Sequence, residues 1–422
     1  MEYLLIGIYI ALAIISVTLT FIKYRCVFQF NTFYTLLWAV VGILALINKV
    51  GMITPRIEIH YIIIFSIILF NILTFIFCKD KIQKKDINTE ESYINYKLIY
   101  IFNIIIFIIL TPFFIKALSA TFNGSFGLRE YMVEYTSASS SVRDYVVVFI
   151  QRNIPMAIIQ ATGIIAGVEL AKGNKKLLII ALIGQALYMF IYGGRVLLMS
   201  FALSFFVAFI LLRKSKKIQF KKRYIVILVI LLAFIVFLTL QRNMDGYSLW
   251  DWGIIYFVGS LSFLELIFQN PASFGLTQLT YGKITFGVIL DPIILILKFL
   301  GLNIVAPNYE YDKYSQPYVN IGDANNPIWY NNTNTIFYPF IRDFGAVGII
   351  IGISFLAGTS IYLQNKFNKT NKNEYLYLLV FMYGVLFNSS LAYDLYTTGA
   401  TITIIFIILA CTRFKWGDKT IC

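Results

Sequence analysis

Runs of apolar residues about 20 residues long alternate with short polar stretches along most of this chain. The runs lie at roughly 3–22, 31–48, 59–78, 97–118, 150–171, 176–192, 196–212, 223–240, 335–364, 374–391 and 398–412. Each is long enough, or nearly so, to cross a bilayer core of about 30 Å as a helix. Two further stretches, 253–269 and 284–301, contain Glu265, Asp291 and Pro292, and they predict either weak spans or interfacial or re-entrant helices. The pattern predicts an all-α, polytopic integral membrane protein with about 11–13 transmembrane helices.

Composition supports this fold class. Of 422 residues, 59% are hydrophobic and 13% are charged, whereas soluble proteins carry about 25% charged residues. The net charge of +14 does not predict a nucleic-acid partner, because basic residues in the loops of membrane proteins report orientation. Glu2 precedes the first apolar run and no small-residue cleavage motif follows it, so we expect a retained first span and no cleaved signal peptide.

Lysine density alternates between successive loops, and this sets the predicted orientation. The lysine-rich loops, predicted to be cytoplasmic, are 23–26, 79–86, 172–176, 213–223, 366–372 and 413–419. The lysine-poor loops, predicted to be outside, are 49–58, 119–149, 192–195, 241–250, 302–334 and 392–397. The N-terminus is then outside and the C-terminus cytoplasmic. We expect one multi-spanning membrane domain over 1–422, with an outer loop at 119–149 and an outer region at 241–334 that ends in the large loop 302–334. These long outer loops are expected to contain short helices.

The sequence predicts no metal site and no cofactor. His60 is the only histidine, and the four cysteines do not have metal-ligand spacing. Neither a phosphate-binding Gly-rich loop, nor a dinucleotide fingerprint, nor a Gly-x-Ser-x-Gly motif is present.

Arginines gather in the predicted outer segments. The segment "GGR" places Gly194 and Arg195 between two apolar runs, at the outer membrane–water boundary. The other outer arginines are Arg129, Arg143, Arg152, Arg242 and Arg342. A guanidinium group can bind phosphate through two parallel hydrogen bonds, and a glycine allows close approach of the backbone to a bound group. The alternative is that these arginines snorkel to the interface or pair with nearby acids such as Asp343.

Two adjacent outer segments suit recognition of sugars. Loop 302–334 collects aromatic residues among Asn and Asp, namely Tyr309, Tyr311, Tyr314, Tyr318, Trp329 and Tyr330. Such rings suit the apolar faces of sugars, and the alternative is an interfacial aromatic belt. The stretch "NTNTIFYPFIRDFGAVGII" (332–350) then enters a span with Asn334, Tyr338, Arg342 and Asp343 near its start. An ordinary interfacial entry with small residues that pack would have a similar sequence.

The outer "GGR", the large late outer loop and the "DFGAVG" motif together resemble the O-antigen polymerase and ligase superfamily of bacterial envelope glycan assembly. In the ligases of this superfamily the last motif begins with His-Asn, and Asn334 stands at the histidine place while Asp343 stands at the acidic place. Because the histidine is missing, the resemblance favours a polymerase over a ligase.

The resemblance implies the substrate, the partners and the chemistry. Such polymerases join undecaprenyl-pyrophosphate-linked oligosaccharides at the outer leaflet of the bacterial plasma (inner) membrane, and they work beside a flippase and a chain-length regulator. The product is O-antigen or capsular polysaccharide. The resemblance implies that Arg195 stabilises the leaving pyrophosphate and that Asp343, or a loop carboxylate such as Asp312 or Asp323, takes the proton of the acceptor hydroxyl. We also assign Asn334 to the catalytic group. Substrate contacts are expected from Arg129, Arg143, Arg152, Gly194, Arg242, Tyr314, Tyr338 and Arg342.

Three other interpretations remain open. An O-antigen ligase is weakened by the missing histidine. A lipid-linked oligosaccharide flippase or ion-coupled transporter predicts charges deep within spans and duplicated halves, neither of which is evident in the sequence. The third is a structural subunit without activity.

Overall fold

The computed structural model describes residues 1–79, 93–122, 149–192, 194, 196–213, 247–302, 304–315, 318–323, 325–330, 334–413, 415–416 and 419–420. Most of these residues are helical, and seven described helices are long and apolar enough to cross a membrane. Three shorter apolar helices lie at Leu178–Tyr192, Val196–Leu212 and Thr398–Cys411. The described residues are therefore mostly helical, and their long apolar helices are compatible with the predicted all-α, polytopic membrane protein. The predicted span at 223–240 and most of the outer loop 119–149 lie outside the described residues.

The described helices begin and end close to the limits of the apolar runs. The first half of the chain contains α1 (Glu2–Tyr24), α2 (Phe30–Ile47), α3 (Ile57–Phe77), α4 (Tyr96–Phe122), a π-helical turn η1 (Phe149–Asn153), α7 (Ile154–Ala171), α8 (Leu178–Tyr192) and α9 (Val196–Arg213). The second half contains α11 (Leu249–Gln269), α12 (Gly287–Phe299), α13 (Pro307–Ser315), α14 (Phe337–Phe344), η2 (Gly345–Val347), α15 (Gly348–Thr370), α16 (Asn373–Asn388), η3 (Asp394–Tyr396) and α17 (Thr398–Cys411). The polar loops therefore separate the helices where the sequence pattern predicts.

The chain divides into two compact units. Unit 1 comprises Met1–Lys85, Val236–Thr370 and Val385–Thr397, and unit 2 comprises Asp86–Ile235, Asn371–Gly384 and Thr398–Cys422. Each unit mixes early and late parts of the sequence, so neither is a continuous piece of the chain.

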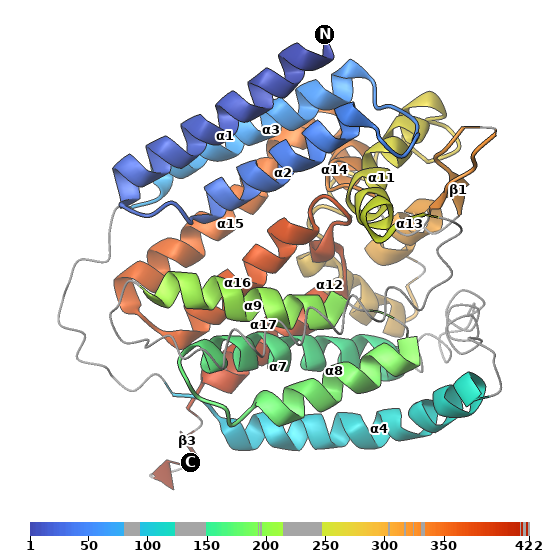
Figure 1. Cartoon of the computed structure of the whole chain (residues 1–422). Coiled ribbons are helices and arrows are strands. Elements are labelled where there is room, and N and C mark those ends of the chain that lie inside the picture. The colour runs from blue at the N-terminus through green and yellow to red at the C-terminus, as the bar shows by residue number, and fades with distance from the viewer. Residues whose placement is uncertain are drawn as a thin grey trace. The chain divides into compact units, whose positions relative to one another are not determined.

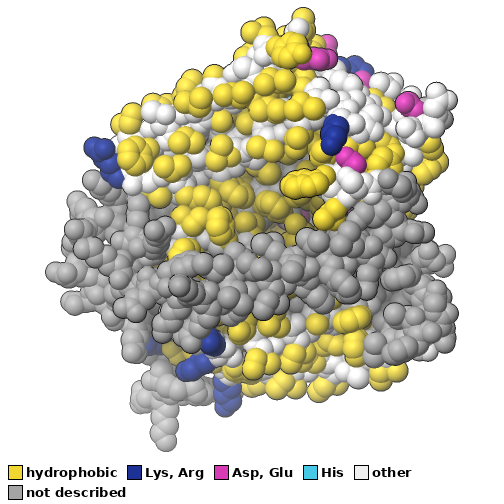
Figure 2. Space-filling view, viewed as in Figure 1, with side chains coloured by type: hydrophobic (Ala, Val, Ile, Leu, Met, Phe, Trp, Pro, Cys, Tyr) yellow, Lys and Arg dark blue, Asp and Glu magenta, His cyan; other side chains and the backbone are white. Residues whose placement is uncertain are grey.

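In unit 1, α1, α2 and α3 pack side by side, and α15 packs against α3 (Figure 1). Polar side chains join the first three helices internally, since the Asn31 amide donates to both Thr20 and Asn71, at 2.8 and 3.0 Å. The exposed surface of α1 includes Leu4, Ile10 and Ile14. Apolar side chains cover much of this part of the molecule (Figure 2). An uninterrupted apolar face of this kind is what a lipid-facing helix requires.

The stretches 253–269 and 284–301, for which the sequence predicts weak spans or interfacial or re-entrant helices, form helices of different length. Helix α12 has 13 residues, or about 20 Å at the usual helical rise, which is too short to cross a bilayer. Helix α11 is long enough by length and composition. However, the Arg56 side chain forms an ion pair with Glu265 at 2.8 Å, and the Tyr330 hydroxyl donates to the Tyr256 carbonyl at 3.2 Å. Glu265, near the C-terminal end of α11, and Tyr256, in its N-terminal half, thus both contact segments from the lysine-poor set of loops.

Short strands fasten the lysine-poor loops of unit 1 to one another. Strand β1 (Val319–Asn320) pairs antiparallel with β2 (Trp329–Tyr330), with Val319 opposite Tyr330. Met52 and Gly322 form an isolated antiparallel bridge, and the Ile53 amide donates to the Ile321 carbonyl at 2.7 Å. Loop 49–58 and loop 302–334 are therefore joined by backbone hydrogen bonds.

A second two-stranded pair, β3 (Lys415–Trp416) and β4 (Lys419–Thr420), lies in unit 2 and is antiparallel.

Unit 2 is built around α7, which packs against α4, α8, α9 and α17. Glu169, near the end of α7, is 5% exposed. Its carboxylate accepts hydrogen bonds from Lys172, Tyr377 and Asn174 at 2.9, 2.8 and 2.9 Å. Buried acids are stable when they are paired and hydrogen-bonded in this way.

Within each unit, the two predicted sets of loops separate. In unit 1, lysine-rich segments meet where Lys23 donates to the Cys78 carbonyl at 3.1 Å and the Asn365 amide donates to the Phe77 carbonyl at 3.0 Å. In unit 2, the Asn95 amide donates to the Ala410 carbonyl at 2.8 Å, and Arg413 lies over the Tyr93 ring. The alternation of the loops agrees with these contacts, and which set faces the cytoplasm stays a prediction.

Candidate functional site

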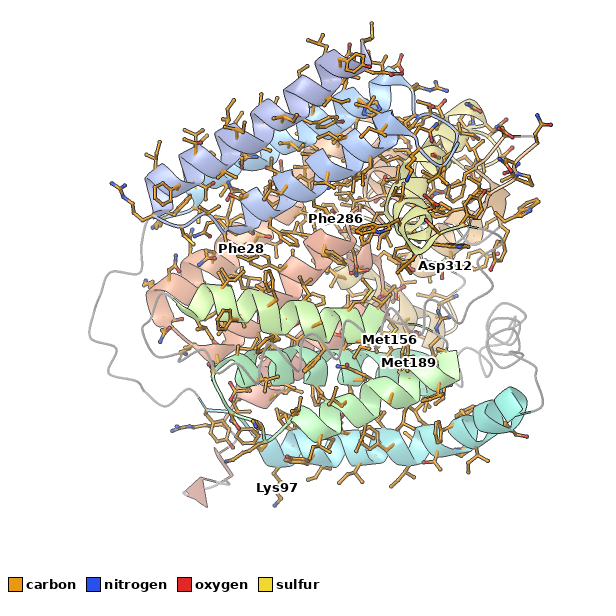
Figure 3. All side chains as sticks on the ribbon, viewed as in Figure 1. Phe28, Lys97, Met156, Met189, Phe286 and Asp312 are labelled. Carbon is orange, nitrogen blue, oxygen red and sulfur yellow. The ribbon has the colours of Figure 1, made fainter. Side chains whose placement is uncertain are left out.

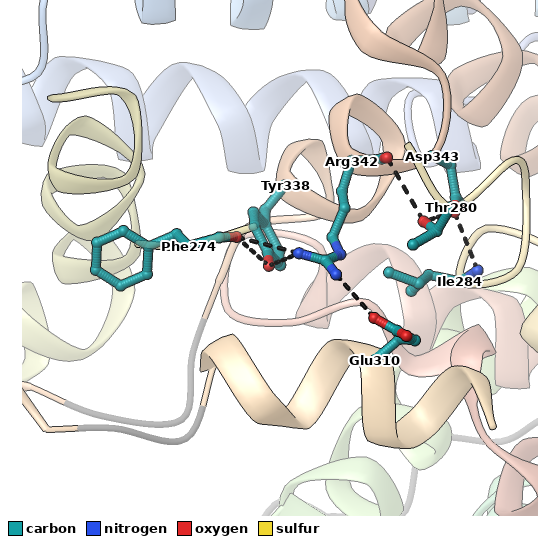
Figure 4. Close-up of polar contacts among 7 residues, drawn as sticks. All are labelled: Phe274, Thr280, Ile284, Glu310, Tyr338, Arg342 and Asp343. Carbon is teal, nitrogen blue, oxygen red and sulfur yellow. Dashed lines mark hydrogen bonds and ion pairs between the residues drawn. The ribbon is translucent and has the colours of Figure 1, made fainter. Parts of the chain in front are cut away.

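Arg342, on α14, is buried in unit 1 and held on several sides (Figure 4). Its Nη2 forms an ion pair with Glu310 of α13 at 2.8 Å, with the two side chains 3% and 22% exposed. Its Nη1 donates to the Phe274 carbonyl at 3.2 Å and to the Tyr338 hydroxyl at 3.4 Å, and the guanidinium lies 4.4 Å from the centre of the Tyr314 ring. Both terminal nitrogens are therefore occupied by the protein itself.

Asp343 fastens a neighbouring loop to α14. Its side chain is fully buried, and its carboxylate accepts hydrogen bonds from the Thr280 hydroxyl and from the backbone amides of Ile284 (3.3 Å) and Thr285. Its backbone carbonyl also accepts the Tyr281 amide at 3.1 Å. A carboxylate with both oxygens occupied by backbone and hydroxyl donors is suited to hold the segment 280–285 in place. This geometry favours a positioning role for Asp343 over proton acceptance.

The glycines of the "DFGAVG" motif have local structural roles. Gly345 ends α14 with φ at +63°, in the left-handed region that favours glycine. A Cβ atom on Gly348 would lie 1.8 Å from the Phe340 carbonyl oxygen, so the start of α15 can approach α14 only because it has no side chain there. The motif therefore sets the break between α14 and α15 within the predicted span 335–364.

Asn334 lies just before α14 in a cluster of tyrosines. Its side chain is fully buried, and within the described residues neither its Oδ1 nor its Nδ2 has a hydrogen-bond partner. Its backbone carbonyl accepts the Tyr311 hydroxyl at 3.4 Å. The ring centres of Tyr311 and Tyr396 lie 4.3 Å apart at a tilt of 38°, and the Tyr396 hydroxyl donates to Asp312 at 3.0 Å. Asp312 lies on α13 (Figure 3). A buried amide without partners beside aromatic and carboxylate groups is an unsatisfied polar group that a ligand could complete.

Asp394, in η3, belongs to the same cluster. One carboxylate oxygen, Oδ2, accepts the Asn388 side-chain amide at 2.7 Å. No described residue donates to Oδ1 of this half-buried side chain. Burial raises the pKa of Asp394 to about 6, and the hydrogen bond from Asn388 opposes that increase. Burial also raises the pKa of the neighbouring Tyr311 and Tyr393 hydroxyls, and the Asp394 charge adds to this effect at both.

A second cluster lies in unit 2, where η1 leads into α7. Arg152 is half-buried, and its charge acts on the hydroxyls of Tyr188 and Tyr192 near the end of α8. The two tyrosine rings lie 4.8 Å apart, and a Cβ atom on Gly194 would lie 3.2 Å from the Tyr188 ring. The Tyr188 hydroxyl also contacts the sulfur of Met156 at 3.4 Å; Met156 on α7 is labelled near Met189 of α8 in Figure 3. π-helical turns such as η1 occur frequently at functional sites.

Arg152 differs from Arg342 in its partners. Among the described residues, no carboxylate lies within ion-pair distance of Arg152. Among the described residues, the guanidinium therefore has no counter-charge that would compete with a phosphate group.

The structure brings some of the predicted site residues together. Asn334, Tyr338, Arg342, Asp343 and Tyr314 gather around α14 in unit 1, while Arg152 and Gly194 both lie beside Tyr188 in unit 2. Arg129, Arg143, Arg195 and Arg242 lie outside the described residues.

Several residues of these clusters have no distinctive signal in the sequence. The partner of Arg342 is Glu310, 32 residues away along the chain. Asp394 lies in the short predicted outer loop 392–397 and Asn388 at the end of α16, and neither belongs to a motif. Tyr188 and Tyr192 have helical spacing just before "GGR", which could have indicated a shared face. The described residues include no group of His, Cys, Asp and Glu side chains that could hold a metal ion.

Comparison with protein families, curated proteins and solved structures gave no match. The resemblance to the polymerase and ligase superfamily therefore depends on the sequence motifs alone.

Proposed function

We propose that this protein is a glycosyltransferase of the plasma membrane that polymerises undecaprenyl-pyrophosphate-linked oligosaccharides into O-antigen or capsular polysaccharide. The observation that carries the proposal is Arg152, which has no carboxylate partner among the described residues and whose charge acts on Tyr188, the residue that Gly194 also lies against. Arg195 follows Gly194 directly in the sequence. A guanidinium group without a carboxylate partner suits the oxygens of a pyrophosphate.

In the proposed reaction, the growing glycan leaves its lipid pyrophosphate and is joined to a hydroxyl of an incoming lipid-linked repeat unit. The bond between the anomeric carbon and the pyrophosphate oxygen breaks, and negative charge grows on that oxygen. Fixed guanidinium groups stabilise this charge more in the transition state than in the substrate. The leaving group is already activated, so the reaction needs neither a nucleotide sugar nor a metal ion.

The alternatives have weaker support. A ligase would depend on the histidine that Asn334 replaces. An ion-coupled carrier or flippase needs buried charged groups that change partners. However, Glu169 is held by Lys172, and Glu265 is held by Arg56. These contacts suit structural ion pairs more than a transport path.

The proposed topology has about 11–13 spans, with the N-terminus outside and the C-terminus in the cytoplasm. The separation of lysine-rich from lysine-poor loops within each unit supports this arrangement. So do the contacts of α11, whose Tyr256 and Glu265 both meet lysine-poor loops; they favour a re-entrant or interfacial helix over a complete span. Partners would be the lipid-linked substrate, a flippase and a chain-length regulator.

Reconstitution tests the function directly. The purified protein in liposomes is given a polyprenyl-pyrophosphate-linked oligosaccharide as its only substrate. Products longer than one repeat unit, together with released polyprenyl pyrophosphate, are expected. Arg195→Ala should reduce the rate by about 100-fold or more, and Arg195→Lys should restore it only in part because lysine lacks the planar fork. Absence of elongation by the wild-type protein, with the substrate intact, would contradict the proposal.

A further inference from the structure

Asp394 differs from the other described acids of its unit that lie close to α14. The carboxylate of Asp343 is held at both oxygens by donors from segment 280–285, and that of Glu310 by Arg342. In contrast, Asp394 is fixed at Oδ2 by the Asn388 amide at 2.7 Å, while no described residue donates to Oδ1. A carboxylate that is oriented at one oxygen and available at the other can accept a proton from a bound molecule.

The surroundings of Asp394 suit a sugar ring. Tyr311 and Tyr396 lie 4.3 Å apart, and the Tyr396 hydroxyl donates to Asp312 at 3.0 Å. Asp312, Asp394 and Tyr396 are half-buried, so these side chains are in part accessible. Aromatic faces with a few convergent polar groups are typical of sites for small polar ligands.

The buried amide of Asn334 is a second, independent observation. The backbone carbonyl of Asn334 accepts the Tyr311 hydroxyl at 3.4 Å, while its side chain is fully buried and within the described residues has no partner at either Oδ1 or Nδ2. An amide left unsatisfied in this way costs free energy unless a ligand or water completes its hydrogen bonds. A hydroxyl group, which both donates and accepts, satisfies either end.

We propose that Asp394 is the proton acceptor for the attacking hydroxyl of the acceptor sugar, with Asn388 as its positioning residue and with Tyr311, Tyr396 and Asn334 forming the acceptor subsite. This inference rests on the proposed function. It assigns the acceptor side of the reaction to unit 1, with Asp394 and Asn388 lying outside the sequence motifs.

The step balances in atoms and charge. As the acceptor oxygen forms its bond to the anomeric carbon of the donor glycan, its proton moves to Oδ1 of Asp394. The bond between the anomeric carbon and the pyrophosphate oxygen breaks, and its electron pair leaves with the lipid pyrophosphate. Asp394 then releases the proton to water, which restores the carboxylate for the next addition.

The pKa of Asp394 suits a group that accepts a proton from a hydroxyl near neutral pH. Burial places its pKa near 6, so the group is mostly ionised at neutral pH while it remains a stronger base than an ordinary aspartate. The titratable groups around it are Tyr311 and Tyr393, with Asp312 next to Tyr311 in the sequence. Neither tyrosine ionises near neutral pH, since burial raises both pKa values well above the ordinary one.

Asp394→Asn in reconstituted full-length protein is the test. The asparagine oxygen can still accept the Asn388 amide, so the fold should be retained, but the side chain cannot take a proton. Elongation of the lipid-linked oligosaccharide should fall by about 100-fold or more. The control is Glu58→Gln, which neutralises an exposed acid in loop 49–58 and should leave the rate unchanged. Asp394→Asn elongating at the wild-type rate would overturn the proposal.

The pH profile separates a positioning role for Asn388 from a structural one. The wild-type rate should increase through about pH 6. Asn388→Ala removes a hydrogen bond that lowers the Asp394 pKa, and it should therefore shift this limb of the profile to higher pH. An unchanged midpoint in Asn388→Ala would contradict the assignment.

The two proposals fail in distinguishable ways. If the proposed function is wrong, the wild-type protein does not elongate the substrate at any pH. If only the present inference is wrong, the wild-type protein elongates the substrate and Asp394→Asn does so equally well.

Discussion

Arg342 of unit 1 and Arg152 of unit 2 are both arginines of predicted outer segments, but the protein uses them differently. Arg342 is almost completely buried, is paired with Glu310, and lies over the Tyr314 ring. Arg152 is half-buried beside two tyrosines and has no ion-pair partner among the described residues. An arginine that the protein has already neutralised stabilises the fold, whereas one with unused donors can bind an anion.

The acids of unit 1 show the same contrast. Asp343 uses both carboxylate oxygens to hold segment 280–285, while Asp394 is held at only one oxygen, by Asn388. The number of protein partners, more than residue type or place in a motif, separates the groups that build the site from those available to a substrate.

The largest expected effect is on the ion pair of unit 1. Glu310→Ala leaves Arg342 buried without its counter-charge, so the free energy of unfolding should fall by about 3 kcal/mol. Arg152→Ala should change it by less than about 1 kcal/mol. Thermal unfolding of the two variants in detergent measures the difference. Equal losses of unfolding free energy in Glu310→Ala and Arg152→Ala would contradict the contrast between the buried, paired Arg342 and the half-buried Arg152.

A pair of glycine substitutions gives the next largest effect. A Cβ atom on Gly275 would lie 1.7 Å from Nη1 of Arg342, and this glycine has φ at +69°. Gly275→Ala should therefore destabilise the protein by about 2 kcal/mol. Gly194→Ala, with its nearest contact at 3.2 Å, should cost less than about 1 kcal/mol. The same unfolding measurement checks both, and a Gly275→Ala protein as stable as the wild type would contradict the close packing around Arg342.

A smaller, pH-dependent effect distinguishes the two acids. The pKa of Asp394 is raised to about 6 from an ordinary 3.8, so the native protein binds a proton there that the unfolded chain does not bind between these values. Its contribution to stability therefore increases as pH falls through 6 and is lost above it. Asp394→Asn should stabilise the protein at pH 8, by about 1 kcal/mol after allowance for partial exposure, and the gain should shrink toward pH 5. A gain that is the same at both pH values would exclude this origin.

Much of the fold could be predicted from the sequence. Apolar runs of span length correspond to helices such as α1, α3 and α7, because nearly every position in such a run must be apolar in lipid. The residues of α12 were ambiguous, since a short apolar run with Pro292 does not reveal how many of its residues remain helical. The break at Gly345 was hidden for a similar reason: a lone glycine is common within spans.

The candidate site was predictable only in part. Asn334, Tyr338, Arg342 and Asp343 lie close together because they share one short helix and the segment before it. The motif could not indicate that Glu310 pairs with Arg342 and that Thr280 donates to Asp343, since these partners are distant in the sequence. Asp394 was missed because its role depends on the tyrosines that bury it.

Affinity for a polyprenyl pyrophosphate is the most direct test of the central claim, that Arg152, which has no ion-pair partner among the described residues, holds the substrate's pyrophosphate. Calorimetry on protein in nanodiscs should show that Arg152→Ala weakens binding by about 10- to 100-fold, while Arg342→Lys, which keeps its charge beside Glu310, binds as the wild type does. Wild-type affinity in Arg152→Ala, or an equal loss in Arg342→Lys, would contradict the account.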